Sequence, residues 1–259
     1  MKNVIFSIGP YTMHGYGLMI GIGIMAAYLM AEYRAKKLQL DVDRVFALCI
    51  SCVLGGFVSA KLLFYIIDYK EILADPSLIL DASYGFVVYG GIIGGILTGY
   101  IFCRIKKLEF LKYFDLIMPS IALAQGFGRI GCFLAGCCYG KETNSFFAIT
   151  FTSSQFAPNG IPLIPTQLIS SVLDFALFFL LVYFEKKKRA DGQVAGLYLI
   201  CYGIGRFILE FFRGDIERGS VGTLSVSQFI SIFILIAGLF TMWFTYILKK
   251  RKTSLPENK

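Results

Sequence analysis

Residues 126–140 read GFGRIGCFLAGCCYG and place a charged side chain, Arg129, at the end of an apolar run. The stretch also holds five glycines and three cysteines. A charge at membrane depth is costly unless a partner, a cavity or an anionic ligand stabilises it. Glycines at this density let backbones approach closely, and irregular backbone inside a membrane is tolerated only where it is buried or lines a cavity. The stretch therefore predicts a polar pocket inside a helical membrane protein.

The composition of the chain is that of an integral membrane protein. Of its 259 residues, 56% are hydrophobic and 16% are charged, and the mean hydropathy is +0.68. A soluble domain of this length carries more charge. The formal net charge of +8 comes from short basic clusters between apolar segments, which is typical of cytoplasmic loops and not of a nucleic-acid-binding face. We therefore exclude nucleic acid as a partner.

The apolar segments predict an all-α integral membrane protein with seven transmembrane helices, in a single domain covering residues 1–259. Each segment is about 20 residues long, which is the length that crosses a bilayer. The first lacks a basic n-region and a cleavage site, so we expect it to stay in the mature protein. Residues 141–165, with three prolines, are expected to form an outer loop with short strands. The expected spans are 16–32, 45–67, 85–103, 113–134, 167–184, 194–212 and 224–248.

The orientation follows from where lysine and arginine gather, because basic loops stay on the cytoplasmic side. Basic clusters occur at residues 34–44, 104–112, 186–189 and 249–252, in alternate loops. The intervening loop 68–84 has a single lysine, Lys70, against four acids. The pattern predicts an N-terminus outside the cell and a C-terminus in the cytoplasm.

Several ionisable residues lie within the expected spans. Arg206, Glu210 and Arg213 are spaced i, i+4 and i+7 behind Tyr202, which predicts one helical face for all four, and Lys61 lies within the second span. In the simplest interpretation this helical face contains an intramembrane ion pair, either Arg206 with Glu210 or Glu210 with Arg213, and we favour the second.

The cations within the spans still outnumber the acids within reach. Asp115 and Asp174 are expected near cytoplasmic or lipid-facing levels, so Arg129, Arg206 and Lys61 remain with too few carboxylates. Arginine suits phosphate through its bidentate fork, and the natural anion in a membrane cavity is a phospholipid headgroup. Tyr89, in the glycine-rich third span, is a further candidate hydrogen-bond donor to a phosphate.

Three of the seven cysteines flank Arg129. Cys132, Cys137 and Cys138 are compatible with a zinc site whose fourth ligand could come only from His14 or an acid, with a disulfide from Cys132 to Cys137 or Cys138, with a reactive thiolate near Arg129, or with simple packing of small side chains. The sequence does not decide among these, and we expect no metal and no cofactor.

Several segments of the chain resemble the prolipoprotein diacylglyceryl transferase family. They run in order along most of the chain and are 14–19 (HGYGLM), 59–62 (SAKL), 128–140 (GRIGCFLAGCCYG), 165–168 (PTQL), 202–213 (YGIGRFILEFFR) and 224–228 (LSVSQ). The chain departs from the family pattern at three places. Cys132 and Cys137 replace an asparagine and a glutamate of the signature, Tyr89 replaces a histidine thought important for activity, and Ile169-Ser170 replaces Tyr-Glu.

The resemblance implies a seven-helix enzyme of the bacterial cytoplasmic (inner) membrane. Its partners would be phosphatidylglycerol, or another anionic phospholipid, and the signal peptide of a prolipoprotein. The reaction implied is transfer of a diacylglyceryl group to the lipobox cysteine, which forms a thioether and releases glycerol phosphate. The implied catalytic residues are Arg129, Arg206, Tyr89 and Glu210; the implied substrate-binding residues are Tyr16, Lys61, Tyr202, Arg213, Gly128, Gly131 and Gly140; and Cys132, Cys137 and Cys138 are possible reactive thiols.

Two alternatives remain open. One is a related phospholipid-dependent transferase with a different acceptor, and the other is a non-catalytic protein that binds or translocates lipid. Because the family histidine is absent, the base that deprotonates the acceptor thiol is also open among Tyr89, Glu210, a cysteine, or no protein base at all.

Overall fold

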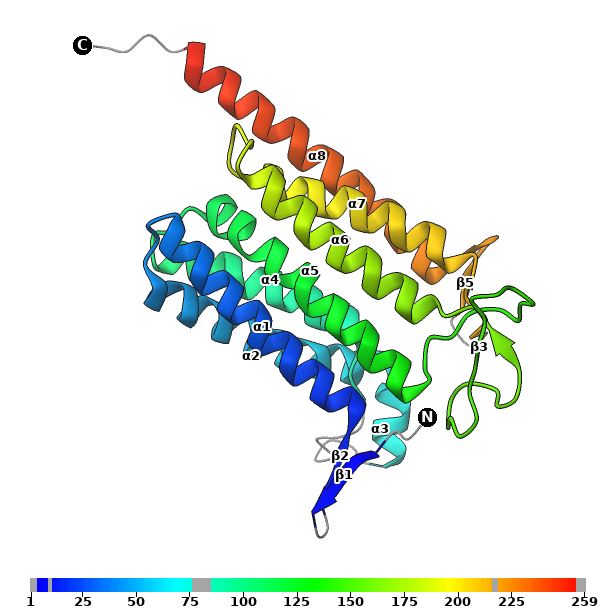
Figure 1. Cartoon of the computed structure of the whole chain (residues 1–259). Coiled ribbons are helices and arrows are strands. Elements are labelled where there is room, and N and C mark those ends of the chain that lie inside the picture. The colour runs from blue at the N-terminus through cyan, green and yellow to red at the C-terminus, as the bar shows by residue number, and fades with distance from the viewer. Residues whose placement is uncertain (1–3, 9–10, 76–84, 216–218, 255–259) are drawn as a thin grey trace. The chain divides into compact units, whose positions relative to one another are not determined.

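The computed structural model describes residues 4–8, 11–75, 85–215 and 219–254, and most of them are helical (Figure 1). The chain divides into two compact units. Unit 1 comprises Met1–Ala31 and Phe114–Lys259, and unit 2 comprises Glu32–Tyr113.

Unit 1 is a bundle of long helices preceded by a hairpin. The hairpin consists of β1 (Val4–Ile8) and β2 (Tyr11–His14), which pair antiparallel. Two helices run from one unit into the other, namely α1 (Gly15–Lys37) and α5 (Phe110–Ala135). The remaining helices of unit 1 are α6 (Thr166–Glu185), α7 (Gln193–Glu210) and α8 (Val226–Ser254).

Unit 2 is built from α2 (Val42–Ile67), the short α3 (Tyr69–Ala74) and α4 (Val88–Ile105). The Asp41 side chain accepts hydrogen bonds from the first backbone N–H groups of α2 and caps that helix. Glycines let α2 and α4 approach closely, since a Cβ added to Gly56 would lie 3.1 Å from the carbonyl oxygen of Gly91. The loop 68–84 lies in part outside the described residues.

Six of the described helices, α1, α2, α4, α5, α6 and α8, are long and apolar enough to cross a membrane. These helices confirm the prediction of an all-α, multi-pass membrane protein. The sixth expected span corresponds to α7, which is not among the six because Gln193, Arg206 and Glu210 lower its hydropathy. The count of seven spans and the orientation of the termini stay predictions.

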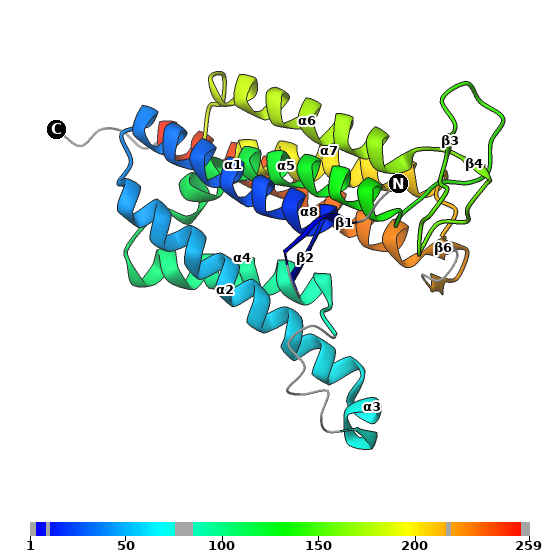
Figure 2. The same cartoon turned by 60° about the horizontal axis from the view of Figure 1, so that its bottom comes forward.

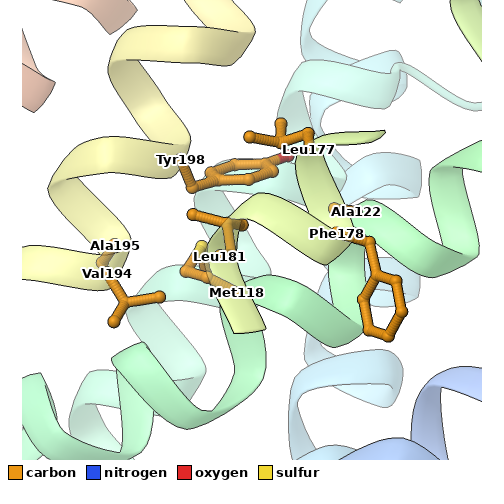
Figure 3. Packing of buried hydrophobic residues seen from close by; sticks show 8 residues of the cluster. All are labelled: Met118, Ala122, Leu177, Phe178, Leu181, Val194, Ala195 and Tyr198. Carbon is orange, nitrogen blue, oxygen red and sulfur yellow. The ribbon is translucent and has the colours of Figure 1, made fainter. Parts of the chain in front are cut away.

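The buried core of unit 1 lies where α5, α6 and α7 meet (Figure 3). Its side chains are Met118, Ala122, Leu177, Phe178, Leu181, Val194, Ala195 and Tyr198.

A buried carboxylate joins α5 to the N-terminus of α7 beside this core. Asp115 is fully buried and accepts hydrogen bonds from the backbone N–H groups of Gly192 and Ala195, both at 2.9 Å. It also pairs with Lys188 at 3.0 Å. Burial alone would lower the pKa of Lys188, but the charge of Asp115 raises that pKa above its ordinary value. A negative charge at a helix N-terminus is favourable, so this contact fixes the start of α7.

The segments that follow α5 and α7 lie at the end of the bundle where those two helices finish and α6 and α8 begin (Figures 1 and 2). They hold the strand pairs β3 (Ile149–Thr150) with β4 (Pro162–Leu163) and β5 (Ser220–Val221) with β6 (Leu224–Ser225). Main-chain hydrogen bonds join the segment after α5 to the segment after α7: Gly214 donates to the carbonyl of Tyr139 at 3.0 Å, and Lys141 donates to that of Phe212 at 2.9 Å.

Candidate functional site

A cavity of about 230 Å³ opens between α5, α6 and α7 in unit 1. Its charged and polar lining comes from Arg129 on α5, Ser170 and Asp174 on α6, and Tyr202 and Arg206 on α7. Leucine side chains at positions 173, 177, 180 and 209 supply much of the remaining wall. The two arginines singled out by the sequence therefore line the same cavity.

Arg129 makes no hydrogen bond and no ion pair with any residue in the described part of the chain. It lies close enough to Tyr202, Cys132, Asp174 and Cys138 to interact with them electrostatically. An arginine at this depth that is not paired with a carboxylate has its donors available for an anionic ligand.

Arg206, in contrast, is held in place by neighbouring side chains. Its guanidinium pairs with Glu210 at 3.0 Å, and the two side chains are only 15% and 6% exposed. The same guanidinium donates to Ser227 Oγ on α8 at 2.8 Å. Arg206 therefore presents its charge to the cavity from a fixed position.

The prediction that Glu210 pairs with Arg213 is wrong. Helix α7 ends at Glu210, so Arg213 has left the helical face on which the i+3 spacing would have placed it. Arg213 instead forms a bidentate ion pair with Asp215, in which Nε lies 3.0 Å from Oδ1 and an Nη nitrogen lies 2.7 Å from Oδ2. Glu210 pairs with Arg206.

The aromatic candidates in unit 1 lie close to these arginines. The ring of Tyr202 stacks on that of Tyr198 at 5.6 Å, and the Tyr198 hydroxyl donates to Gln125 at 2.9 Å. Tyr16 packs where α1 meets α5: a Cβ added to Gly131 would lie 3.2 Å from the Tyr16 ring.

The three signature glycines differ in what surrounds them. Gly131 allows the close contact with α1, whereas a Cβ on Gly128 would meet nothing within 4 Å. Gly140 is the most confined, because a Cβ there would lie 2.5 Å from the carbonyl oxygen of Ile164. Of the three, only Gly128 has open space beside it.

Lys61 and Tyr89 belong to unit 2. The Lys61 ammonium lies over three aromatic rings, at 5.3 Å from Phe64, 5.4 Å from Tyr65 and 5.3 Å from Phe86. These contacts stabilise its charge within unit 2. Tyr89 lies in the first turn of α4 and is 38% exposed.

The cysteines around Arg129 form one cluster. The sulfur atoms of Cys132, Cys137 and Cys138 all lie within 4.8 Å of one another, and no disulfide joins them. Cys132 lies in the last turn of α5, and the chain reverses immediately afterwards through Gly136, at φ 80°. Cys138 is itself at φ 62°, a left-handed conformation that is uncommon for a residue other than glycine. We call these three residues the thiol cluster.

The thiols of the cluster share hydrogen bonds. The bond with Cys132, followed by that with Cys137, lowers the pKa of Cys138, and the charges of Arg213 and Arg129 act in the same direction against burial. The pKa of Cys137 is raised by its side-chain contacts with Cys132 and Cys138, and its thiol donates to the carbonyl oxygen of Cys132 at 3.7 Å.

Sequence reasoning missed the residues that support this site. Asp174 does not face lipid as expected; it is 8% exposed and lines the cavity with Arg129. Thr166 and Gln167, at the start of α6, donate to the carbonyl oxygens of Cys138 and Cys137, both at 2.8 Å. Only the family resemblance points to residues 165–168 (PTQL). Nothing in their local pattern indicates a contact with residues about 30 positions away.

Fold and site together define a multi-pass helical membrane protein with a cavity between its helices that is lined by two arginines. A sequence profile described as prolipoprotein diacylglyceryl transferase matches residues 3–244. The chain belongs to that family.

Individual relatives are similar over nearly the whole chain. A phosphatidylglycerol–prolipoprotein diacylglyceryl transferase of Clostridium tetani is 49% identical and covers 93% of this chain and 96% of its own length. A second protein of that name from Clostridium perfringens is 48% identical, with 92% and 93% covered. One from Clostridioides difficile is 32% identical, with 99% and 100% covered. These relatives do not favour either of the alternatives left open by the sequence.

Proposed function

We propose that this protein transfers the diacylglyceryl group of phosphatidylglycerol to the lipobox cysteine of prolipoproteins, forming a thioether and releasing glycerol phosphate. The observation that carries the proposal is the cavity between α5, α6 and α7, where Arg129 is without a carboxylate partner in the described chain and faces the same space as Arg206. Arginine donors aimed at one point suit the phosphate diester of the donor lipid.

In this proposal the two arginines act on the leaving group. As the bond between the glyceryl carbon and the phosphate oxygen breaks, negative charge grows on the phosphate, and fixed cations stabilise it most where water is excluded. Arg129 supplies free donors, and Arg206 supplies a charge held by Glu210 and Ser227. The leucine wall accommodates the apolar part of the lipid, and Gly128 leaves space beside Arg129.

The other predicted site residues keep assisting roles. Tyr202 is proposed to donate to the phosphate from the cavity wall, and Tyr16 and Arg213 to act near the thiol cluster. Lys61 stays a proposed substrate-binding residue and Tyr89 a proposed catalytic residue; both belong to unit 2. Gly131 and Gly140 are proposed to act through the close backbone contacts they allow.

The membrane topology belongs to the same proposal. We propose seven spans with α7 as the sixth, one functional domain, an N-terminus outside and a C-terminus in the cytoplasm, in the bacterial inner membrane. The acceptor is then the signal peptide of an exported prolipoprotein. Reporter fusions that place residues 186–189 outside the cell would contradict this orientation.

The test is a transfer assay with the purified protein in phosphatidylglycerol nanodiscs and a synthetic lipobox peptide. Mass spectrometry should detect the thioether-linked peptide, and equal amounts of glycerol phosphate should appear. A peptide with serine in place of the lipobox cysteine should give no product. Nanodiscs of phosphatidylethanolamine test the donor headgroup.

Variants of the two arginines link the activity to the cavity. Arg129→Ala and Arg206→Ala should each lower kcat by about 10²–10³ and reduce the phosphatidylglycerol that co-purifies. Arg44→Ala, which removes an exposed cation at the start of α2, serves as the control and should change neither. Unchanged lipid occupancy and an unchanged transfer rate in both cavity variants would refute the assignment.

A further inference from the structure

The thiol cluster is built like a metal site. Zinc binds thiolate sulfur at about 2.3 Å in tetrahedral geometry, which puts sulfur atoms about 3.8 Å apart. The three sulfur atoms of Cys132, Cys137 and Cys138 already lie within 4.8 Å of one another. A shift of about 1 Å in side-chain positions therefore brings all three onto one zinc ion.

The backbone around the cluster is fixed independently of any metal. After α5 ends, the N–H groups of Gly136 and Cys137 donate to the carbonyl of Cys132 at 2.9 and 3.2 Å, which closes the turn. Thr166 and Gln167, only 3% and 1% exposed, donate to the carbonyls that follow. The left-handed conformation of Cys138 is held within this frame. Supporting contacts of this kind orient metal ligands in known sites.

The cluster has three ligands, and the described part of the chain adds no fourth histidine, cysteine or carboxylate to it. Three protein ligands with an open fourth position distinguish catalytic from structural zinc sites. The three cysteines are half-buried, so a further ligand has access.

The surrounding charge is suitable as well. Zinc bound by three thiolates carries one net negative charge, and the guanidinium groups of Arg213 and Arg129 lie within electrostatic range of Cys138. Basic side chains beside an anionic metal site offset the cost of burying it.

We propose that Cys132, Cys137 and Cys138 bind one zinc ion whose open position takes the acceptor cysteine of the prolipoprotein as a thiolate. This inference rests on the proposed transferase function and supplies the thiol activation that the family histidine would otherwise provide.

The chemical step balances without a redox partner. Binding to zinc releases the thiol proton to water. The zinc-bound sulfur attacks the glyceryl carbon that carries the phosphate ester, a carbon–sulfur bond forms, and the carbon–oxygen bond breaks. The electron pair of that bond leaves with the phosphate as glycerol phosphate, stabilised by the two cavity arginines, and zinc stays divalent throughout.

The first experiment measures metal content. The full-length protein, purified without chelators, is analysed by inductively coupled plasma mass spectrometry before and after incubation with zinc. We expect one zinc per chain, and loss of zinc in each of Cys132→Ser, Cys137→Ser and Cys138→Ser. Cys49→Ser, in α2, is the matched control and should keep its zinc. The proposal would be overturned if the wild-type protein held no more zinc than the serine variants. It would also be overturned if the cluster held copper instead of zinc, or if it contained a disulfide.

The second experiment tests the open position and does not depend on activity. With cobalt substituted for zinc, thiolate coordination gives an absorption band in the near ultraviolet. Adding the lipobox peptide should strengthen this band, and the peptide with serine in place of cysteine should not. An unchanged spectrum would overturn the role of zinc in binding the acceptor.

Transfer assays then separate the two proposals. If chelation abolishes transfer and zinc restores it, both stand. Normal transfer by metal-free protein overturns the zinc inference and leaves the transferase function intact. A zinc-loaded protein that binds the peptide but transfers nothing from phosphatidylglycerol contradicts the function and leaves the metal site standing.

Discussion

Replacing Asp115 with asparagine should destabilise unit 1 strongly. The carboxylate is fully buried and accepts two backbone N–H groups at 2.9 Å as well as the ammonium of Lys188 at 3.0 Å. Asparagine has nearly the same shape but no charge. Its amide NH2 group can only donate hydrogen bonds, and it would replace a carboxylate oxygen at a point where three donors already converge. Breaking a buried ion pair in this way costs about 3–5 kcal/mol.

The structure supplies a matched control on the same lysine. Asp191 contacts the Lys188 ammonium at 2.9 Å, but its side chain is 40% exposed. Exposed pairs contribute about 0–1 kcal/mol. Asp191→Asn should therefore change stability little, although the ion pair that it removes, at 2.9 Å, is no longer than the one to Asp115, at 3.0 Å.

The assay is thermal unfolding of the purified variants in detergent. For a domain of this size 1 kcal/mol shifts Tm by about 2–4 °C, so Asp115→Asn should lower Tm by about 6–20 °C. Adding Lys188→Met to Asp115→Asn should recover part of the loss, because it removes an ammonium whose remaining partner, Asp191, is 40% exposed. Equal Tm values for Asp115→Asn and Asp191→Asn would refute the reasoning.

Three further predictions concern the site and its frame. Arg129→Lys should retain part of the transfer activity lost in the alanine variant, because lysine keeps the charge but not the bidentate fork; activity no better than that of alanine would show that geometry outweighs charge. Glu210→Gln should lower stability by about 3–5 kcal/mol by stranding the arginine of α7, and a variant as stable as wild type yet inactive would make Glu210 catalytic instead. Gly136→Ala should destabilise by about 1–3 kcal/mol or more, because φ is 80° and the new Cβ collides with Ser154 Oγ. Gly160→Ala, at φ 79° with nothing within 4 Å, should show the smaller cost of the backbone conformation alone, and equal Tm losses for the two would contradict the collision.

The helices could be predicted from the sequence because their signal is local. Runs of apolar residues give each span directly, so the expected spans 45–67 and 113–134 fall within α2 and α5. The two arginines of the cavity could be singled out for the same reason, since a cation in an apolar segment is visible without any knowledge of its neighbours.

The partners of these charges could not be predicted, because they depend on where helices end and which helices meet. The i+3 spacing from Glu210 to Arg213 indicates a pair only if the helix continues, and α7 stops between them. Asp115 binds the start of α7, about 77 residues away, and this long-range contact has no sequence signature. The thiol cluster joins positions i, i+5 and i+6, which share no helical face and meet only because the chain turns at Gly136.

The main-chain bonds between the segments that follow α5 and α7 bear on how such a protein can diverge. Because Tyr139, Lys141 and Phe212 take part through backbone atoms, drift in their side chains leaves the junction unchanged. Gly140 and Gly214 have no such freedom, since an added Cβ would lie 2.5 Å from a neighbouring carbonyl oxygen at each. Substitutions can therefore accumulate at these three positions without moving the junction, whereas a side chain at either glycine would push the two segments apart.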